Sequence, residues 1–84
     1  MTKYQTLEKL DILRQTIKDL PDSVDVISAD VVGYRDSNVH LYDGVEAVNT
    51  FAEAKGIGPH VSLEYDTRKF FCTNDGVEVF TLLH

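Results

Sequence analysis

Apolar residues recur at intervals of three and four between residues 3 and 20, and this spacing predicts an amphipathic helix. Its apolar stripe consists of Leu7, Leu10, Leu13, Ile17 and Leu20. Thr2 and Gln5 can form a capping box at the start, and Pro21 disfavours helical geometry at the end. Ile12 lies off the stripe, so we expect its flank to contact a second element or a partner.

A second, shorter helix is predicted over about residues 44–55. Its apolar stripe consists of Val45, Val48, Phe51 and Ala52. Asp43 and Glu46 have the spacing of a capping box at its start. Gly56 stands where a helix commonly ends on a left-handed residue, and Ile57 can fold back onto the last turn.

The segment between the helices predicts a β-hairpin. Residues 24–34 are rich in β-branched side chains, which suit strands. The apolar positions change parity near Ser28, which indicates either a bulge or a strand covered on both faces. Turn-forming residues at 35–38 then lead into a short strand at 39–42.

The last third of the chain predicts a strand meander. Apolar and polar residues alternate over 60–66, a turn is expected at 66–69, and a strand follows at 70–73. Asn74-Asp75-Gly76 is a strong hairpin signal. The final strand, 77–83, is apolar on both faces and therefore needs cover on both.

The predicted order α-β-β-α-β-β-β is typical of an α+β fold, a mostly antiparallel sheet with two helices packed on it. We expect a single domain spanning residues 1–84. The economical arrangement places both helices on one face of the sheet. The other face is then partly open, or is covered by the first helix or by a second subunit.

Length and composition favour a binding protein over an enzyme. A chain of this mass buries about 63% of its unfolded surface, which leaves little room for a deep private cleft. No apolar run is long enough for a transmembrane helix, and the first ten residues lack the apolar region of a signal peptide. The single cysteine, Cys72, excludes an internal disulfide, so the cytoplasm is the expected location.

Negative charge is concentrated in the middle of the chain. The formal net charge is −6, and residues 21–66 carry nine acidic against two basic side chains. Such a segment repels a phosphate backbone, so we expect no direct binding of nucleic acid. The same charge steers basic partners toward the protein.

Residue types that carry catalytic or metal chemistry are present but not in diagnostic patterns. His40, His60, His84 and Cys72 lack the spacing of a structural zinc site, and no cofactor or metal is expected. The aromatic neighbours of Cys72 predict a buried thiol. Gly56-Ile57-Gly58-Pro59 follows a helix, whereas phosphate-binding loops precede one.

The acidic hairpin with its tyrosines is the predicted contact surface for a protein partner, because tyrosine is enriched in interfaces. The predicted partner-binding residues are Asp30, Tyr34, Asp36, Tyr42 and Asp43. The two-faced final strand and Ile12 also favour a homodimer, since a short chain struggles to cover both faces of its sheet.

The stretch 74–83 and the helix that ends at Lys55-Gly56 before a hairpin resemble the small uncharacterised accessory proteins of phages and prophages. The resemblance covers residues 39–83 and includes no catalytic motif. It implies a compact acidic α+β module, and some such proteins bind and inhibit host factors, including defence nucleases.

These observations lead to the hypothesis of a non-enzymatic protein-binding module, of the kind by which a phage or mobile element binds or inhibits a host protein. An acidic mimic of nucleic acid, which blocks a DNA- or RNA-binding protein, is the first alternative. A small enzyme is the second alternative, and it requires a pocket with converging polar groups.

Overall fold

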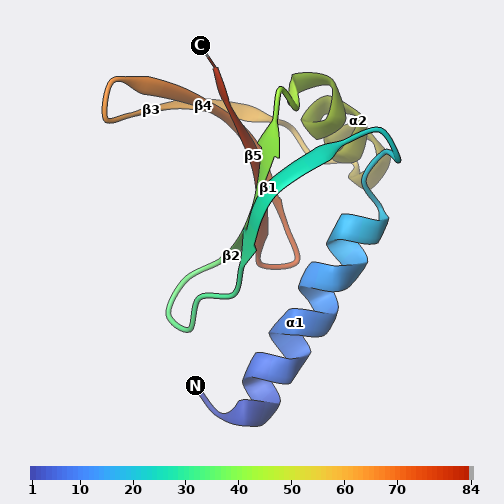
Figure 1. Ribbon diagram of the computed structural model, residues 1–84, viewed down its shortest axis with the longest axis vertical. Coiled ribbons are helices and arrows are strands. Elements are labelled where there is room, and N and C mark those ends of the chain that lie inside the picture. Colours follow the sequence, from blue (N-terminus) through green and yellow to red (C-terminus); the bar gives the residue numbers. More distant parts are fainter. Residues whose placement is uncertain (84) are drawn as a thin grey trace.

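The computed structural model describes residues 1–83 and contains two helices and five strands (Figure 1). In chain order they are α1 (Lys3–Lys18), β1 (Asp25–Asp30), β2 (Ser37–Tyr42), α2 (Val45–Lys55), β3 (His60–Glu64), β4 (Thr67–Asn74) and β5 (Val77–Leu83). The predicted order of elements and the α+β fold are therefore confirmed.

The five strands form one sheet in the order β1-β2-β5-β4-β3. β2 and β5 run parallel, and the other three pairs are antiparallel. The parallel pair is at the centre because the chain leaves β2 through α2 and returns to it only after β3 and β4. β4 pairs with β5 from Arg68 to Asn74, and β3 is the edge strand beyond it (Figure 1).

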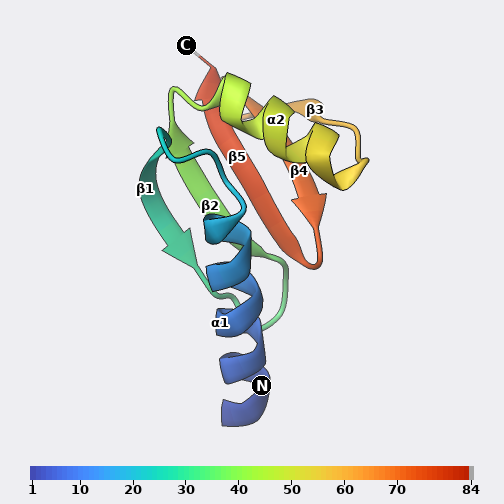
Figure 2. The ribbon, with the colours of Figure 1, turned by 90° about the vertical axis from the view of Figure 1, so that its right-hand side faces the viewer.

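Both helices pack on the same face of the sheet (Figure 2), where α1 contacts β2 and β5 and α2 contacts β4 and β5. The core is made of alternate residues of the three central strands and one stripe of each helix. Its buried apolar members are Leu13, Leu20, Val39, Leu41, Val48, Phe51, Ala52, Cys72, Val77 and Val79.

The start of α1 is capped as predicted, but its apolar stripe is only partly buried. The Thr2 hydroxyl accepts from the Gln5 amide at 3.1 Å, and the Gln5 side chain accepts from the Thr2 amide at 2.8 Å. Leu7 and Leu10 remain 55% and 46% exposed. The first turns of α1 extend past the end of the sheet (Figure 1), so these side chains have no sheet beneath them.

The predicted capping box at Asp43 is wrong. Asp43 has a φ of 48°, and the N-cap of α2 is Gly44, which makes no side-chain capping bond. Instead the Gly44 amide donates to the hydroxyl of Thr81 in β5 at 3.0 Å, and that hydroxyl donates to the carbonyl of Leu41 at 3.0 Å. The start of α2 is therefore held by a residue far away in sequence.

The end of α2 is the predicted one. Gly56 is the C-cap with a φ of 69°, and the Ile57 amide donates back to the Ala52 carbonyl at 2.9 Å. This left-handed residue lets the chain turn toward β3.

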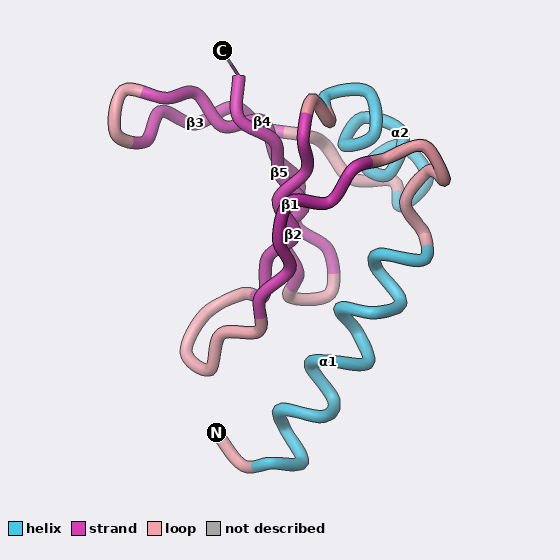
Figure 3. Tube along the Cα trace, in the orientation of Figure 1, coloured by secondary structure: helices cyan, strands magenta, loops and turns pink. Residues whose placement is uncertain are grey.

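The hairpins follow the predicted pattern with shifted bounds. β1 ends at Asp30, so residues 31–36 form a loop (Figure 3). Of the two alternatives for its change of parity, the structure has the bulge, which lies between Val26 and Ser28. The β3–β4 turn consists of Tyr65 and Asp66, both with positive φ, so β4 begins at Thr67 and not at Phe70. The turn at Asp75-Gly76 is confirmed.

Candidate functional site

The sheet face opposite the helices is left open in the part of the chain that the structure describes (Figure 2). One row of side chains crosses it through all five strands, because each strand register places the next residue alongside. In spatial order the row is Ser28, His40, Phe80, Phe71 and His60.

The centre of the row is aromatic. The rings of His40 and Phe80 stack with their centroids 4.5 Å apart and their planes at 11°. The rings of His60 and Phe71 are tilted at 42° with centroids 5.7 Å apart. Both phenylalanines remain half-buried, so apolar area stays accessible on this face.

Lys69 lies over this aromatic row and forms salt bridges with two carboxylates. Its Nζ is 2.7 Å from Glu78 Oε1 and 3.1 Å from Glu64 Oε1, and it sits 4.9 Å from the centroid of the Phe71 ring. Burial lowers the pKa of Lys69, but the hydrogen bonds it donates to Glu78 and Glu64 outweigh burial, so its pKa is raised. The ammonium is therefore a structural cation that joins β3, β4 and β5.

Two shallow hollows adjoin the open face on either side of the stacked pair, and Leu82 lines both; the second reaches round the end of the sheet to Val45 at the start of α2. The first, of about 560 Å³, is lined by Asp30 and Asp36 together with Phe80. The second, of about 620 Å³, is lined by Tyr42 and Asp43 together with His40. Four of the five predicted partner-binding residues therefore lie around this face, in two groups at opposite ends of β2.

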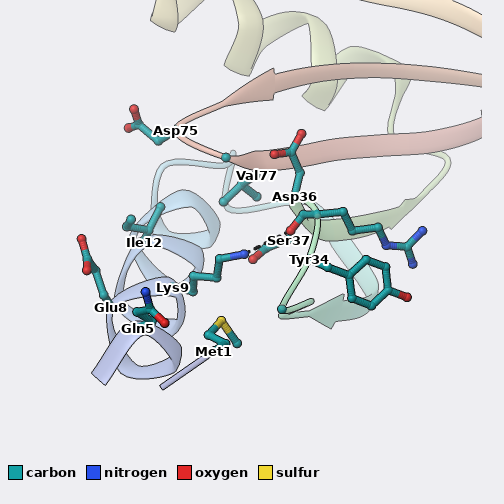
Figure 4. Close-up of a pocket in the computed structure, with 13 residues that line it drawn as sticks. Met1, Gln5, Glu8, Lys9, Ile12, Tyr34, Asp36, Ser37, Asp75 and Val77 are labelled. Atoms are coloured by element: carbon teal, nitrogen blue, oxygen red, sulfur yellow. Dashed lines mark hydrogen bonds between the residues drawn. The ribbon is translucent and has the colours of Figure 1, made fainter. Parts of the chain in front are cut away.

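Tyr34, the fifth predicted residue, lies in the β1–β2 loop and is 88% exposed. It lines a separate cleft of about 660 Å³ between that loop and the first half of α1 (Figure 4). The Lys9 ammonium enters this cleft and donates to the carbonyls of Val32 at 2.7 Å and Arg35 at 3.1 Å. Lys9 thus ties the loop to α1.

Sequence reasoning did not identify the aromatic row or Lys69. It considered His40 and His60 only as possible zinc ligands and assigned residues 66–69 to a turn. The available signal was the β5 pattern, in which Phe80 and Leu82 face away from the core side of the strand. The alignment of Phe80 with Phe71 depends on the register of the β4–β5 hairpin, and its alignment with His40 depends on strand order, which the pattern does not encode.

Cys72 is fully buried on the helix side of the sheet, as predicted. Desolvation raises the pKa of its thiol, which disfavours the reactive thiolate. Within residues 1–83 no three His, Cys, Asp or Glu side chains are close enough to hold a metal ion. His84, the remaining candidate ligand, lies outside the described residues.

Neither described helix is long and apolar enough to cross a membrane. Comparisons with protein-family models, curated proteins and solved structures produced no match to this chain.

Proposed function

We propose that this protein is a non-enzymatic binding module whose open sheet face takes an extended, basic segment of a partner protein. The observation that carries the proposal is a sheet face that no element of residues 1–83 covers, with half-buried aromatic rings between two hollows. Aromatic side chains supply much of the energy of protein interfaces, and accessible ones on a sheet are ready anchors.

The charge around the first hollow favours a basic partner. Asp30, Asp36, Glu64 and Glu78 line it, against Arg35 and Lys69. Lys69 is already paired with both glutamates. The charged side chains left to attract a ligand are therefore two acidic ones, Asp30 and Asp36, and one basic one, Arg35. Together with the net charge of −6, this arrangement steers basic segments toward the face.

Tyr42 supports the same proposal. Its side chain is 64% exposed beside the second hollow, whereas Tyr34 lies in the separate cleft beside α1. A large ring left in water contributes little to the stability of the fold. Because it loses little conformational entropy when a partner covers it, it is well suited to an interface.

The alternatives are less well supported. Lys69 and Arg35 interrupt the acidic side chains, whereas mimicry of nucleic acid calls for an unbroken acidic stripe. The Lys9 ammonium in the cleft beside α1 is bonded to two backbone carbonyls, so it links the β1–β2 loop to the helix and lends no support to a small enzyme. We further propose, from the resemblance to phage accessory proteins, a cytoplasmic host protein as the partner.

A displayed library of random peptides, selected against the immobilised protein, tests the proposal. We expect enriched peptides to be basic with an aromatic or aliphatic anchor, and to shift the NMR signals of His40 and Phe80. Replacing Asp30 and Asp36 by Asn should slow association about tenfold at low ionic strength. The matched control replaces Glu53 and Asp66, which do not line the hollows, by Gln and Asn.

The control has the same net charge as the test variant, so it separates local charge from overall charge. Peptides that bind both variants alike, or that shift signals only on α1, would contradict the assignment of the open face.

A further inference from the structure

The two edges of the sheet differ in how they are protected against pairing with another strand. An edge strand carries unpaired amide and carbonyl groups, which proteins usually guard with bulges, charges or proline. β1 is guarded by its bulge between Val26 and Ser28 and by Asp25 and Asp30 at its ends. β3 pairs with β4 in an unbroken register from His60 to Glu64 and has no bulge.

The backbone amide and carbonyl groups on the free edge of β3 belong to Val61 and Leu63. A two-residue turn makes its flanking residues, Glu64 and Thr67, a hydrogen-bonded pair, and hydrogen bonding then alternates along the strand. His60, Ser62 and Glu64 therefore direct their backbone groups to β4. Val61 and Leu63 direct theirs away from the sheet, and their side chains are 58% and 70% exposed.

We propose that β3 pairs antiparallel with β3 of a second copy of this chain, about a two-fold axis at Ser62. This register places Val61 of each copy opposite Leu63 of the other on the helix side of the sheet, so the apolar pair occurs twice. On the open face it places His60 opposite Glu64 of the second copy, so each cross-strand pair is complementary. Val61 and Leu63 are then hydrogen-bonded pairs, which uses all their outward backbone groups.

The centre of this register has an independent sign of an absent neighbour. The hydroxyl of Ser62 is the one buried side-chain oxygen or nitrogen in residues 1–83 that lacks a hydrogen-bond partner. A buried polar group without a partner is costly, and native proteins rarely leave one. Pairing at Ser62 brings the two hydroxyls together, and rotation about χ1 lets one donate to the other.

Self-pairing of β1 offers no comparable match. An antiparallel arrangement of two β1 strands that overlap fully sets Asp25 opposite Asp30 of the second copy at both ends, and like charges directly opposite destabilise a sheet. β3 therefore differs from β1 in having an unbroken register and complementary charges when it pairs with itself. The inference does not depend on the proposed function, which concerns the open face.

Sedimentation equilibrium from micromolar to millimolar concentration tests the pairing. We expect the wild type to form a concentration-dependent dimer. V61P removes an outward amide without removing a bond to β4, and it should raise the dissociation constant about thirtyfold, for two lost hydrogen bonds. L63K, which keeps the backbone amide and adds a charge to the exposed edge, should have a similar effect.

Ile27→Lys on β1 is the matched control, since Ile27 is 56% exposed on the opposite edge and should leave the dimer intact. Circular dichroism establishes that each variant is folded. D30N/D36N should also dimerise normally, which separates failure of this inference from failure of the proposed function.

A cysteine in place of Ser62 tests the register directly. Opposed residues of a non-hydrogen-bonded pair lie about 4.5 Å apart at Cα, within the range of a disulfide. With oxidised glutathione, S62C should form a covalent dimer much faster than S28C, the same substitution on β1, and Cys72 is buried in both. A monomeric wild type at millimolar concentration, association that survives V61P and L63K, or equal cross-linking of S62C and S28C would each overturn the inference.

Discussion

Thr81 is a buried residue whose hydroxyl, and not its bulk, joins two parts of the fold. It is 1% exposed, accepts from the Gly44 amide and donates to the Leu41 carbonyl, both at 3.0 Å. Substitution by Val keeps the shape and volume of the side chain but removes both bonds. The Gly44 amide at the start of α2 then has no replacement from water, because Gly44 is buried.

The magnitude follows from those two bonds. Each contributes about 1 kcal/mol net, so T81V should lower the free energy of unfolding by about 2 kcal/mol. A domain of this length has a stability of roughly 4–13 kcal/mol at 0.05–0.15 kcal/mol per residue. The same loss corresponds to a fall in melting temperature of about 8–16 °C.

Urea unfolding followed by circular dichroism measures the change, and an unaltered m-value would show that the unfolded ensemble is unaffected. Thr73→Val is the control, because Thr73 is exposed on β4 and its substitution should change stability by less than about 0.5 kcal/mol. If T81V were as stable as T73V, the bridge from β5 to α2 would contribute nothing and the reasoning would be refuted.

Two further predictions concern backbone geometry and pH. Gly44→Ala should cost about 1–3 kcal/mol because its Cβ would lie 2.6 Å from Leu41 Cβ, whereas Gly56→Ala meets nothing within 4 Å and should cost only the left-handed penalty of about 1 kcal/mol. Thermal melts would contradict this if G56A were the less stable variant. The raised pKa values of Lys69 and Cys72 mean that the folded state holds these protons more tightly than the unfolded state does. Their contribution to the free energy of unfolding is therefore complete below the unfolded-state pKa values, about 8.5 for Cys and 10.4 for Lys. The free energy of unfolding should therefore fall as pH rises from 8 to 11, less steeply in K69M and in C72A, and a flat profile in the wild type would disprove the link.

Features that depend on neighbouring residues were predictable from the sequence. The capping box of Thr2 and Gln5, the left-handed end of α2 at Gly56 and the turn at Asp75-Gly76 each involve residues within a few positions of one another. The element order and the fold class followed from the same short-range patterns. Periodicity also showed a change of parity along β1, which left either a bulge or cover on both faces, and the structure has the bulge.

The candidate site was predicted only in part. Sequence reasoning selected residues at both ends of β2 by charge and aromatic content, but it could not align Phe71 with Phe80 or place Lys69 between Glu64 and Glu78. Phe71 and Phe80 meet across the β4–β5 pairing, and Lys69 reaches Glu64 and Glu78 on the strands to either side of β4, so both arrangements depend on the exact register of neighbouring strands. The turn expected at 66–69 placed Lys69 outside a strand, and the contact of Phe80 with His40 required the β2–β5 pairing, whose partners are far apart in sequence.

The amino-acid pattern alone was enough for the order of helices and strands and for some of their ends, such as the start of α1 and the end of α2, because these rest on backbone conformation and on contacts within one or two turns. Three features depend on contacts between distant segments: Asp43 does not cap α2, Leu7 and Leu10 stay exposed, and no element within residues 1–83 covers the second face of the sheet. Periodicity shows which side of an element is apolar. Whether that side is covered depends on how far the neighbouring element extends in space.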